Sequence, residues 1–110
     1  MKIKSKIWIE SNNGILLSEG RVQLLKKIDE TGSLNKASKA LNISYQKAWR
    51  LLDEVSKTTK QPIIETKIGG SKGGGTLLTP YGKSLISIYE TINKDCWDFL
   101  DEQLKKHSLC

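Results

Sequence analysis

Side chains that hydrogen-bond bases and phosphates are concentrated between residues 44 and 57 of the 110-residue sequence. Arg50 offers a guanidinium that can pair with guanine, and Gln46 an amide that can pair with adenine. Apolar residues at helical spacing form the opposite, inner face: Ala48, Leu51, Leu52 and Val55. The outward set is therefore Ser44, Tyr45, Gln46, Lys47, Trp49 and Arg50. We expect residues 44–57 to be a recognition helix in the major groove of DNA. The alternative is a solvated helix face without a partner.

Trp49 has two interpretations within this set. An exposed ring would contact DNA, whereas a partly buried ring would brace the helix against the rest of the domain. We favour the brace and keep Trp49 as a candidate contact.

A second, shorter helix precedes the recognition helix, and the two together predict a helix-turn-helix over residues 33–58. Ser33 and Ser44 are good N-caps for the two helices, and Asn42 tolerates the left-handed backbone that the turn requires. The inward residues expected for the first helix are Leu34, Ala37, Ala40 and Leu41, and the outward ones are Asn35, Lys36, Ser38 and Lys39. From this helix Ser33 and Lys36 join the candidate DNA contacts.

A glycine-rich hairpin over residues 62–78 offers a second contact with DNA. The run GGSKGGG separates two segments of strand-like composition, and glycines let a backbone approach a polyanion closely. Lys72 at the tip and Lys67 below it, with Ser71 and Gly73, would touch the phosphate backbone or the minor groove. The alternative is a loop without a binding role.

The other predicted elements surround these two. Alternating isoleucines and a turn at residues 11–14 predict a β-hairpin over residues 1–17, and a helix follows over 18–31 with Val22, Leu25 and Ile28 inward. Gly32 ends that helix. Thr79 and Pro80 then begin a long helix over 79–107. The fold class expected is mostly α with small β-hairpins, as one winged helix-turn-helix domain.

The long helix carries apolar residues at the four-and-three spacing of a two-helix seam. They are Leu85, Tyr89, Ile92, Cys96 and Phe99. We expect this seam to hold a homodimer together, and the alternative is a stripe that packs only on its own domain.

Charge and cysteine content agree with a DNA-binding protein of the cytoplasm. The formal net charge is +6. Residues 1–78 contain 14 Lys plus Arg against 7 Asp plus Glu, a net of +7, whereas residues 79–110 contain 4 against 5, a net of −1. The basic excess therefore accompanies the helix-turn-helix and favours a polyanionic partner. Cys96 and Cys110 have no disulfide or metal spacing, and the sequence predicts neither a signal peptide nor a membrane span.

Residues that would make an enzyme are scarce. His107 is the only histidine, and it has no catalytic or metal-binding spacing to either cysteine. Gly82, Lys83 and Ser84 match the end of a phosphate-binding loop, but Leu77 occupies the position where that motif needs its first glycine. We expect no enzymatic activity, no metal and no cofactor.

The order of these elements and several short motifs resemble the N-terminal DNA-binding domain of the ModE-type molybdate-responsive transcription regulators, which are relatives of the LysR-type winged helices. The motifs are Glu19-Gly20-Arg21, Thr31-Gly32-Ser33-Leu34, Ile43-Ser44-Tyr45 with Ala48-Trp49, and the run from Gly69 to Gly75 followed by Leu78-Thr79-Pro80-Tyr81-Gly82.

This resemblance implies a dimeric winged-helix regulator that binds a pseudo-palindromic operator, with the first and last helices building the dimer. The sequence departs from the family in having no residues left for a molybdate-binding region. It is expected to be either a stand-alone DNA-binding version, whose sensing is lost or supplied by a separate sensor protein, or part of a larger regulator. The alternative function is a winged-helix module that binds another protein rather than DNA.

Overall fold

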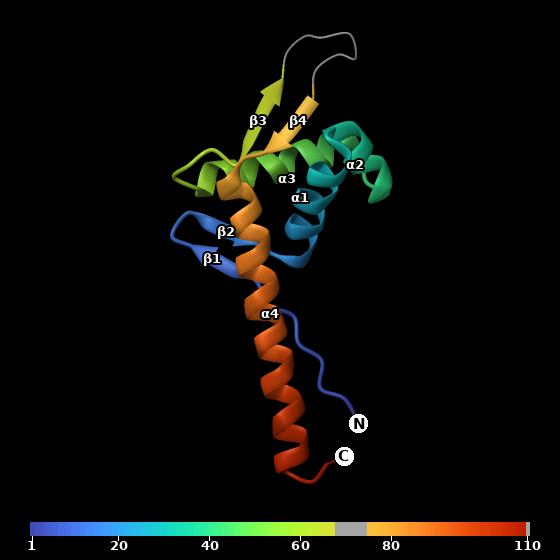
Figure 1. The fold of residues 1–110 in the computed structure, drawn as a ribbon, viewed down its shortest axis with the longest axis vertical. Helices are drawn as coiled ribbons and strands as arrows, with labels where there is room; N and C mark the ends of the chain where they lie inside the picture. Colours follow the sequence, from blue (N-terminus) through green and yellow to red (C-terminus); the bar gives the residue numbers. More distant parts are fainter. Residues whose placement is uncertain (68–74, 110) are drawn as a thin grey trace.

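Two β-hairpins and a series of helices alternate in the computed structural model, which describes residues 1–67 and 75–109 (Figure 1). The element order is β1 (Ile9–Ser11), β2 (Gly14–Leu17), α1 (Glu19–Thr31), α2 (Leu34–Ala40), α3 (Tyr45–Thr58), β3 (Ile64–Lys67), β4 (Gly75–Leu78) and α4 (Pro80–Lys106). Both sheets are antiparallel two-stranded hairpins. The boundaries of the helices agree with the predicted ones to within a residue or two.

The core lies around α1, which contacts α2, α3, β4 and α4. Its inward residues Val22, Leu25 and Ile28 are buried as predicted, together with Leu24. Ala48, Leu52 and Val55 supply the part of the core that comes from α3. Because these residues repeat at helical spacing, burying them fixes which side of α3 faces solvent.

A serine or threonine is the N-cap of every α-helix in the described chain. Its side-chain oxygen accepts a hydrogen bond from the backbone N–H three residues later, which satisfies a donor that the first helical turn leaves free. The capping residues are Ser18, Ser33, Ser44 and Thr79. Gly32 ends α1 with a left-handed φ of 69°, and Asn42 turns the chain between α2 and α3 with a φ of 57°.

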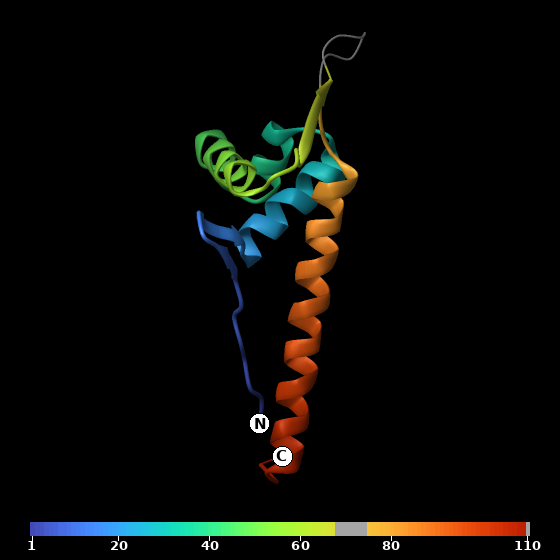
Figure 2. The same cartoon turned by 90° about the vertical axis from the view of Figure 1, so that its left-hand side faces the viewer.

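The first hairpin is shorter than predicted. Residues 1–8 form no strand and run as an extended segment beside α4 (Figure 2). Two contacts attach this segment: the Tyr89 hydroxyl donates to the Ile7 carbonyl at 3.0 Å, and the Ser5 hydroxyl lies 3.7 Å from the Cys96 sulfur. The isoleucine alternation correctly indicated extended backbone. The prediction of a strand was wrong because pairing also needs a second strand alongside.

The first helix of the helix-turn-helix is turned slightly from the predicted orientation. Ser38, expected outside, is 2% exposed, and Ala40, expected inside, is exposed. Burial of Ser38 is tolerated because its hydroxyl donates to the Asn35 carbonyl at 2.7 Å. Its own carbonyl accepts from the Ile43 N–H at 3.0 Å and so holds the turn.

Helix α4 is 27 residues long and extends well beyond the rest of the domain (Figures 1 and 2). The principal-axis extents are 60 × 29 × 23 Å, which is elongated for a chain of this length. Leu85 and Tyr89, in the half nearer the domain, are buried in the core. No helix of residues 1–67 and 75–109 combines the length and apolarity that crossing a membrane requires.

Candidate nucleic-acid interface

The turn between α2 and α3 is fixed by backbone and capping hydrogen bonds. The Ser33 hydroxyl accepts from Lys36 N at 3.1 Å, and the Ser44 hydroxyl accepts from Lys47 N at 3.1 Å. Between the helices, Asn42 N donates to the Lys39 carbonyl at 3.1 Å. Each capping oxygen thus accepts a bond from its own helix, and each hydroxyl proton remains for another acceptor.

The outer face of α3 carries the predicted set of side chains. Gln46 and Arg50 lie one turn apart and are exposed, and Lys47 is exposed beside them. Lys36 is exposed in the first turn of α2, whereas Ser33 is half-buried. The structure therefore presents amide, ammonium and guanidinium groups on the outer face of α3, and a further ammonium at the start of α2.

The cations on this face are available for an external anion. Among residues 1–67 and 75–109, Lys36, Lys47 and Arg50 form no ion pair within 4.0 Å. Lys57, further along α3, pairs with Asp53 one turn earlier at 2.9 Å. That pair places a cation beside the Asp53 carboxylate and so lowers the repulsion that a nearby phosphate would otherwise meet.

Trp49 is about half buried and half accessible, a position that suits both a brace and a DNA contact, and its role stays a prediction. Its side chain is 53% exposed, and Tyr45, one turn earlier, is 51% exposed. Ala48, beside them in the sequence, fills the buried position at this level of α3. Tyr45 and Trp49 therefore each leave about half of their surface open to solvent.

The base of the wing is attached to the helix-turn-helix by its backbone. Thr76 N donates to the Gly32 carbonyl at 2.9 Å, and a Cβ at Gly75 would lie 2.9 Å from the same oxygen. β3 and β4 pair in register from Ile64 opposite Leu78 to Lys67 opposite Gly75. Only a residue without a side chain fits Gly75 without moving this junction. The wing-tip candidates Ser71, Lys72 and Gly73 lie outside the described residues.

A second junction attaches the wing to α4. The Thr79 hydroxyl donates to the Pro62 carbonyl at 2.7 Å and accepts from Gly82 N at 3.0 Å, and Thr79 N donates to the Ile63 carbonyl at 3.0 Å. A Cβ at Gly82 would collide with that Ile63 carbonyl oxygen. Gly82 is therefore required for close approach of two backbones, which the sequence reasoning did not identify.

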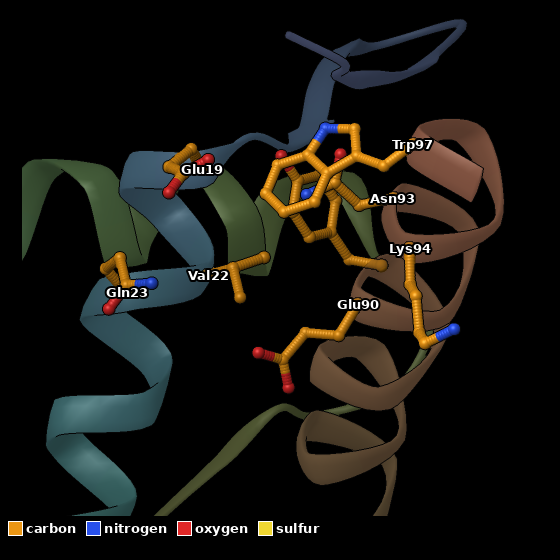
Figure 3. Close-up of a pocket in the computed structure, with 8 residues that line it drawn as sticks. Glu19, Val22, Gln23, Glu90, Asn93, Lys94 and Trp97 are labelled. Atoms are coloured by element: carbon orange, nitrogen blue, oxygen red, sulfur yellow. The ribbon is translucent and has the colours of Figure 1, made fainter. Parts of the chain in front are cut away.

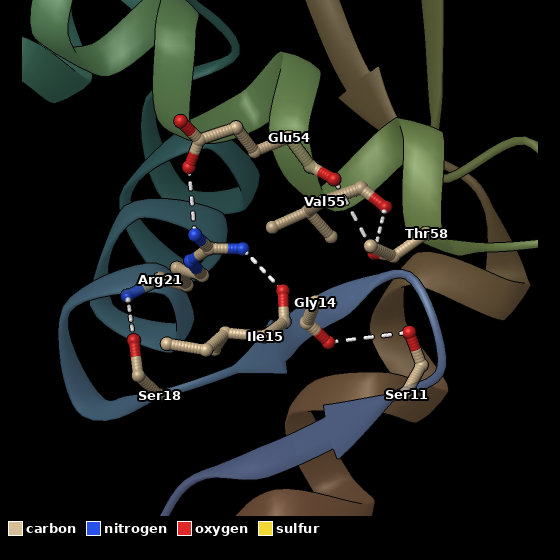
Figure 4. A network of polar contacts seen from close by, with 8 residues as sticks. All are labelled: Ser11, Gly14, Ile15, Ser18, Arg21, Glu54, Val55 and Thr58. Atoms are coloured by element: carbon tan, nitrogen blue, oxygen red, sulfur yellow. Dashed lines mark hydrogen bonds and ion pairs between the residues drawn. The ribbon is translucent and has the colours of Figure 1, made fainter.

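Arg21 on α1 connects that helix to the recognition helix (Figure 4). Its guanidinium donates to the Ile15 carbonyl in β2 and to the Glu54 carboxylate in α3, the latter at 2.7 Å. Its side chain is 12% exposed. Sequence reasoning noted Arg21 only as part of a family motif, because nothing local connects it to Glu54, 33 residues later.

The predicted dimerisation seam on α4 is divided by the structure. Leu85 and Tyr89 are buried within the chain's own core, and Cys96 is half-buried beside the N-terminal segment. Ile92 is 47% exposed and Phe99 is 59% exposed. The alternative of intrachain packing is thus correct for the first half of the seam, and the second half leaves apolar surface open.

A cavity of about 280 Å³ lies between α1 and α4 (Figure 3). Glu19 and Gln23 line it from α1, and Glu90, Asn93 and Trp97 line it from α4. Burial raises the pKa of the phenol of Tyr89, which also lines the cavity, and the negative charge of Glu19 raises it further. No cluster of His, Cys, Asp and Glu suited to a metal ion occurs in the described ranges.

Comparison with solved structures defines the architecture. A mutant of MepR from a multidrug-resistant S. aureus clinical isolate superposes with a TM-score of 0.62 at 18% identity, over 80% of this chain and 65% of that one. A MarR family transcription regulator gives 0.61 at 20% identity, over 84% and 62%. The fold is a winged helix-turn-helix. In that fold α3 is the second helix of the helix-turn-helix, and β3 and β4 form the wing.

Comparison with curated proteins confirms the resemblance to ModE regulators. The chain is 36% identical over 94 residues to the DNA-binding transcriptional dual regulator ModE of Escherichia coli, and 36% identical over 86 residues to the transcriptional regulator ModE of Haemophilus influenzae. It is 32% identical over 97 residues to the molybdenum transport protein ModE of Azotobacter vinelandii. These matches cover 81%, 78% and 88% of this chain, which spans 36%, 34% and 36% of those proteins, about a third of their length. No family model matches the chain.

Proposed function

We propose that this chain binds double-stranded DNA sequence-specifically, as a homodimeric transcription regulator, with α3 in the major groove. The observation that carries the proposal is the outer face of α3, where Gln46, Lys47 and Arg50 are exposed together. The similarity to proteins named as transcriptional regulators, one of them named as DNA-binding, supports it.

Base recognition is assigned to Gln46 and Arg50. The major groove admits an α-helix, and each base pair presents a distinct pattern of donors and acceptors there. A guanidinium can donate two parallel bonds to guanine O6 and N7, and an amide can do the same for adenine N6 and N7. The two residues lie one turn apart on α3, so they can reach neighbouring base pairs.

Phosphate contacts are assigned to Lys36, Lys47 and the hydroxyls of Ser33 and Ser44. Lys36 and Ser33 lie at the start of α2. Lys47 and Ser44 lie at the start of α3, where free N–H groups and the helix dipole favour an anion. Such contacts fix the register of the protein on the duplex without reading sequence. The wing residues Lys67, Ser71, Lys72 and Gly73 are proposed as a further contact with the backbone or the minor groove.

Dimerisation is assigned to the part of α4 that projects from the domain. Ile92 and Phe99 are exposed there, and Ile88, one turn before Ile92, is exposed on the same side of the helix. A second copy that covered this apolar surface would create two recognition helices related by symmetry. The expected footprint is two half-sites about one helical turn, about 34 Å, apart.

The test is selection from a randomised duplex library, followed by titration at several salt concentrations. We expect an enriched motif with two half-sites, and a loss of affinity for it of about tenfold to a hundredfold in Arg50→Ala. Lys105→Ala, an exposed cation at the far end of α4, is the matched control and should bind normally. Unchanged binding by Arg50→Ala would show that α3 is not the reading element.

The exposed apolar residues of α4 favour one second function, docking of a different protein without specific DNA binding. Salt distinguishes the two. Binding through several cations weakens steeply as salt rises, with a slope proportional to the number of phosphates neutralised, whereas binding through an apolar surface does not. Retention of a protein partner together with no enriched DNA motif would favour this second function.

A further inference from the structure

We propose that Tyr45 and Trp49 form an apolar reading surface for the 5-methyl group of thymine in the major groove. This inference rests on the proposed function and adds a class of base that the polar residues of α3 do not select. It assigns a role to two aromatic rings that are not part of the buried core.

Exposure of these rings is the first observation. Tyr45 and Trp49 are 51% and 53% exposed, whereas Ala48, Leu52 and Val55 on the same helix are no more than 5% exposed. Leaving large apolar side chains in water forgoes the stabilisation that burial provides, roughly in proportion to their area. A surface that buries the rings on binding would recover it.

Position on the helix is the second observation. Tyr45 is the first residue of α3 and Trp49 lies one turn later, so the rings lie on the same side. With about 3.6 residues per turn, that side lies between the buried stripe of Ala48 and Leu52 and the outermost residues Gln46 and Arg50. The rings thus border the polar reading face, and a helix seated in the groove brings them beside the same base pairs.

Chemistry of the groove is the third consideration. The thymine methyl is the one apolar group that unmodified base pairs display in the major groove, and aromatic or aliphatic side chains contact it. Gln46 and Arg50 are suited to purines. An apolar surface beside them complements these contacts, because the same A·T pair that shows adenine to an amide shows its partner's methyl group nearby.

The experiment replaces each thymine of the selected half-site, one at a time, by deoxyuridine. This removes the methyl group and keeps every hydrogen-bonding group. At one or more positions the wild-type protein should lose about three- to fourfold in affinity, the value expected for one buried methyl group. In Trp49→Ala or Tyr45→Ala the loss at that position should disappear, since the contact is already absent.

Trp8→Ala is the matched control. Trp8 is 54% exposed but lies outside α3, beside the first hairpin, so this variant should show the full wild-type response to deoxyuridine. Neutral substitution at every thymine would overturn the inference, and so would an equal loss in the wild type and both α3 variants. A library that enriches no motif would overturn the proposed function and this inference with it. An enriched motif that ignores the methyl groups would overturn the inference alone.

Discussion

Arg21 and Glu54 join α1 to the recognition helix, with Arg21 Nη2 2.7 Å from Glu54 Oε2 (Figure 4). The same guanidinium donates to the carbonyl of Ile15 in β2. One side chain thus ties the first hairpin, α1 and α3 together. The pair thereby fixes the orientation of α3 relative to α1.

Removing this connection should weaken both folding and DNA binding. We expect Arg21→Ala to lower the free energy of unfolding by about 1–2 kcal/mol, since Glu54 is 44% exposed and water screens part of the interaction. A double-mutant cycle with Glu54→Gln, measured by urea denaturation, isolates the pair. Lys27→Ala breaks the exposed Lys27–Glu30 pair and should cost no more than about 0.5 kcal/mol. An equal loss of unfolding free energy in Arg21→Ala and Lys27→Ala would contradict the special role of Arg21.

Two glycine-to-alanine changes should have opposite effects on stability. At Gly82 a Cβ would collide with the backbone oxygen of Ile63, so Gly82→Ala should destabilise the domain by about 1–3 kcal/mol. At Gly20 in α1 a Cβ would meet no atom within 4 Å, so Gly20→Ala should stabilise it by about 0.5 kcal/mol. Thermal unfolding of both variants is the measurement. Tolerance of alanine at Gly82 would show that α4 and the base of the wing are less closely packed than described.

Ser44 has two assigned roles that one substitution separates. Aspartate caps a helix about as well as serine, so Ser44→Asp should keep the stability of the domain. Its added negative charge at the start of α3 should lower DNA affinity by about tenfold or more. Ser18→Asp makes the same change at the cap of α1, and we expect neither stability nor affinity to change there. If both aspartate variants bind DNA normally, Ser44 does not face phosphate.

Tyr89 should make stability depend on alkaline pH. Burial raises the pKa of its phenol above the ordinary value, which means that the folded state favours the protonated form. Its contribution is therefore complete below the unfolded pKa of about 10 and is lost as pH rises through the higher folded pKa. Near neutral pH, Tyr89→Phe should cost about 0.5–1.5 kcal/mol through the lost bond to Ile7. The wild-type advantage should shrink between about pH 9 and pH 11 in denaturant titrations. An advantage that grows with pH would contradict the assignment.

Local signals allowed most of the fold to be predicted from the sequence. Capping and turn residues act within a few positions of where they stand, and for that reason Ser44, Gly32 and Asn42 predicted the ends of helices correctly. Helical spacing likewise predicted the buried side of α3 and therefore its exposed side. The predicted polar face of the recognition helix depended on this one property.

The errors concern contacts between distant segments. Whether residues 1–8 form a strand depends on a partner strand, and whether Leu85 and Tyr89 face a second copy depends on where α1 lies. The Arg21–Glu54 pair and the backbone contact at Gly82 are of the same kind, because each joins elements that the sequence does not place next to each other.

The central claim is that Gln46 and Arg50 read base edges in the major groove. It is tested most directly by replacing each purine of the selected half-site with its 7-deaza analogue, which removes the N7 acceptor and leaves base pairing intact. We expect the wild type to lose affinity when particular purines are replaced. In Gln46→Ala the replacement of the adenine that Gln46 contacts should cause no additional loss, and in Arg50→Ala the same should hold for the guanine that Arg50 contacts. Affinity that is unchanged by every 7-deaza substitution, or reduced equally in the wild type and both variants, would contradict it.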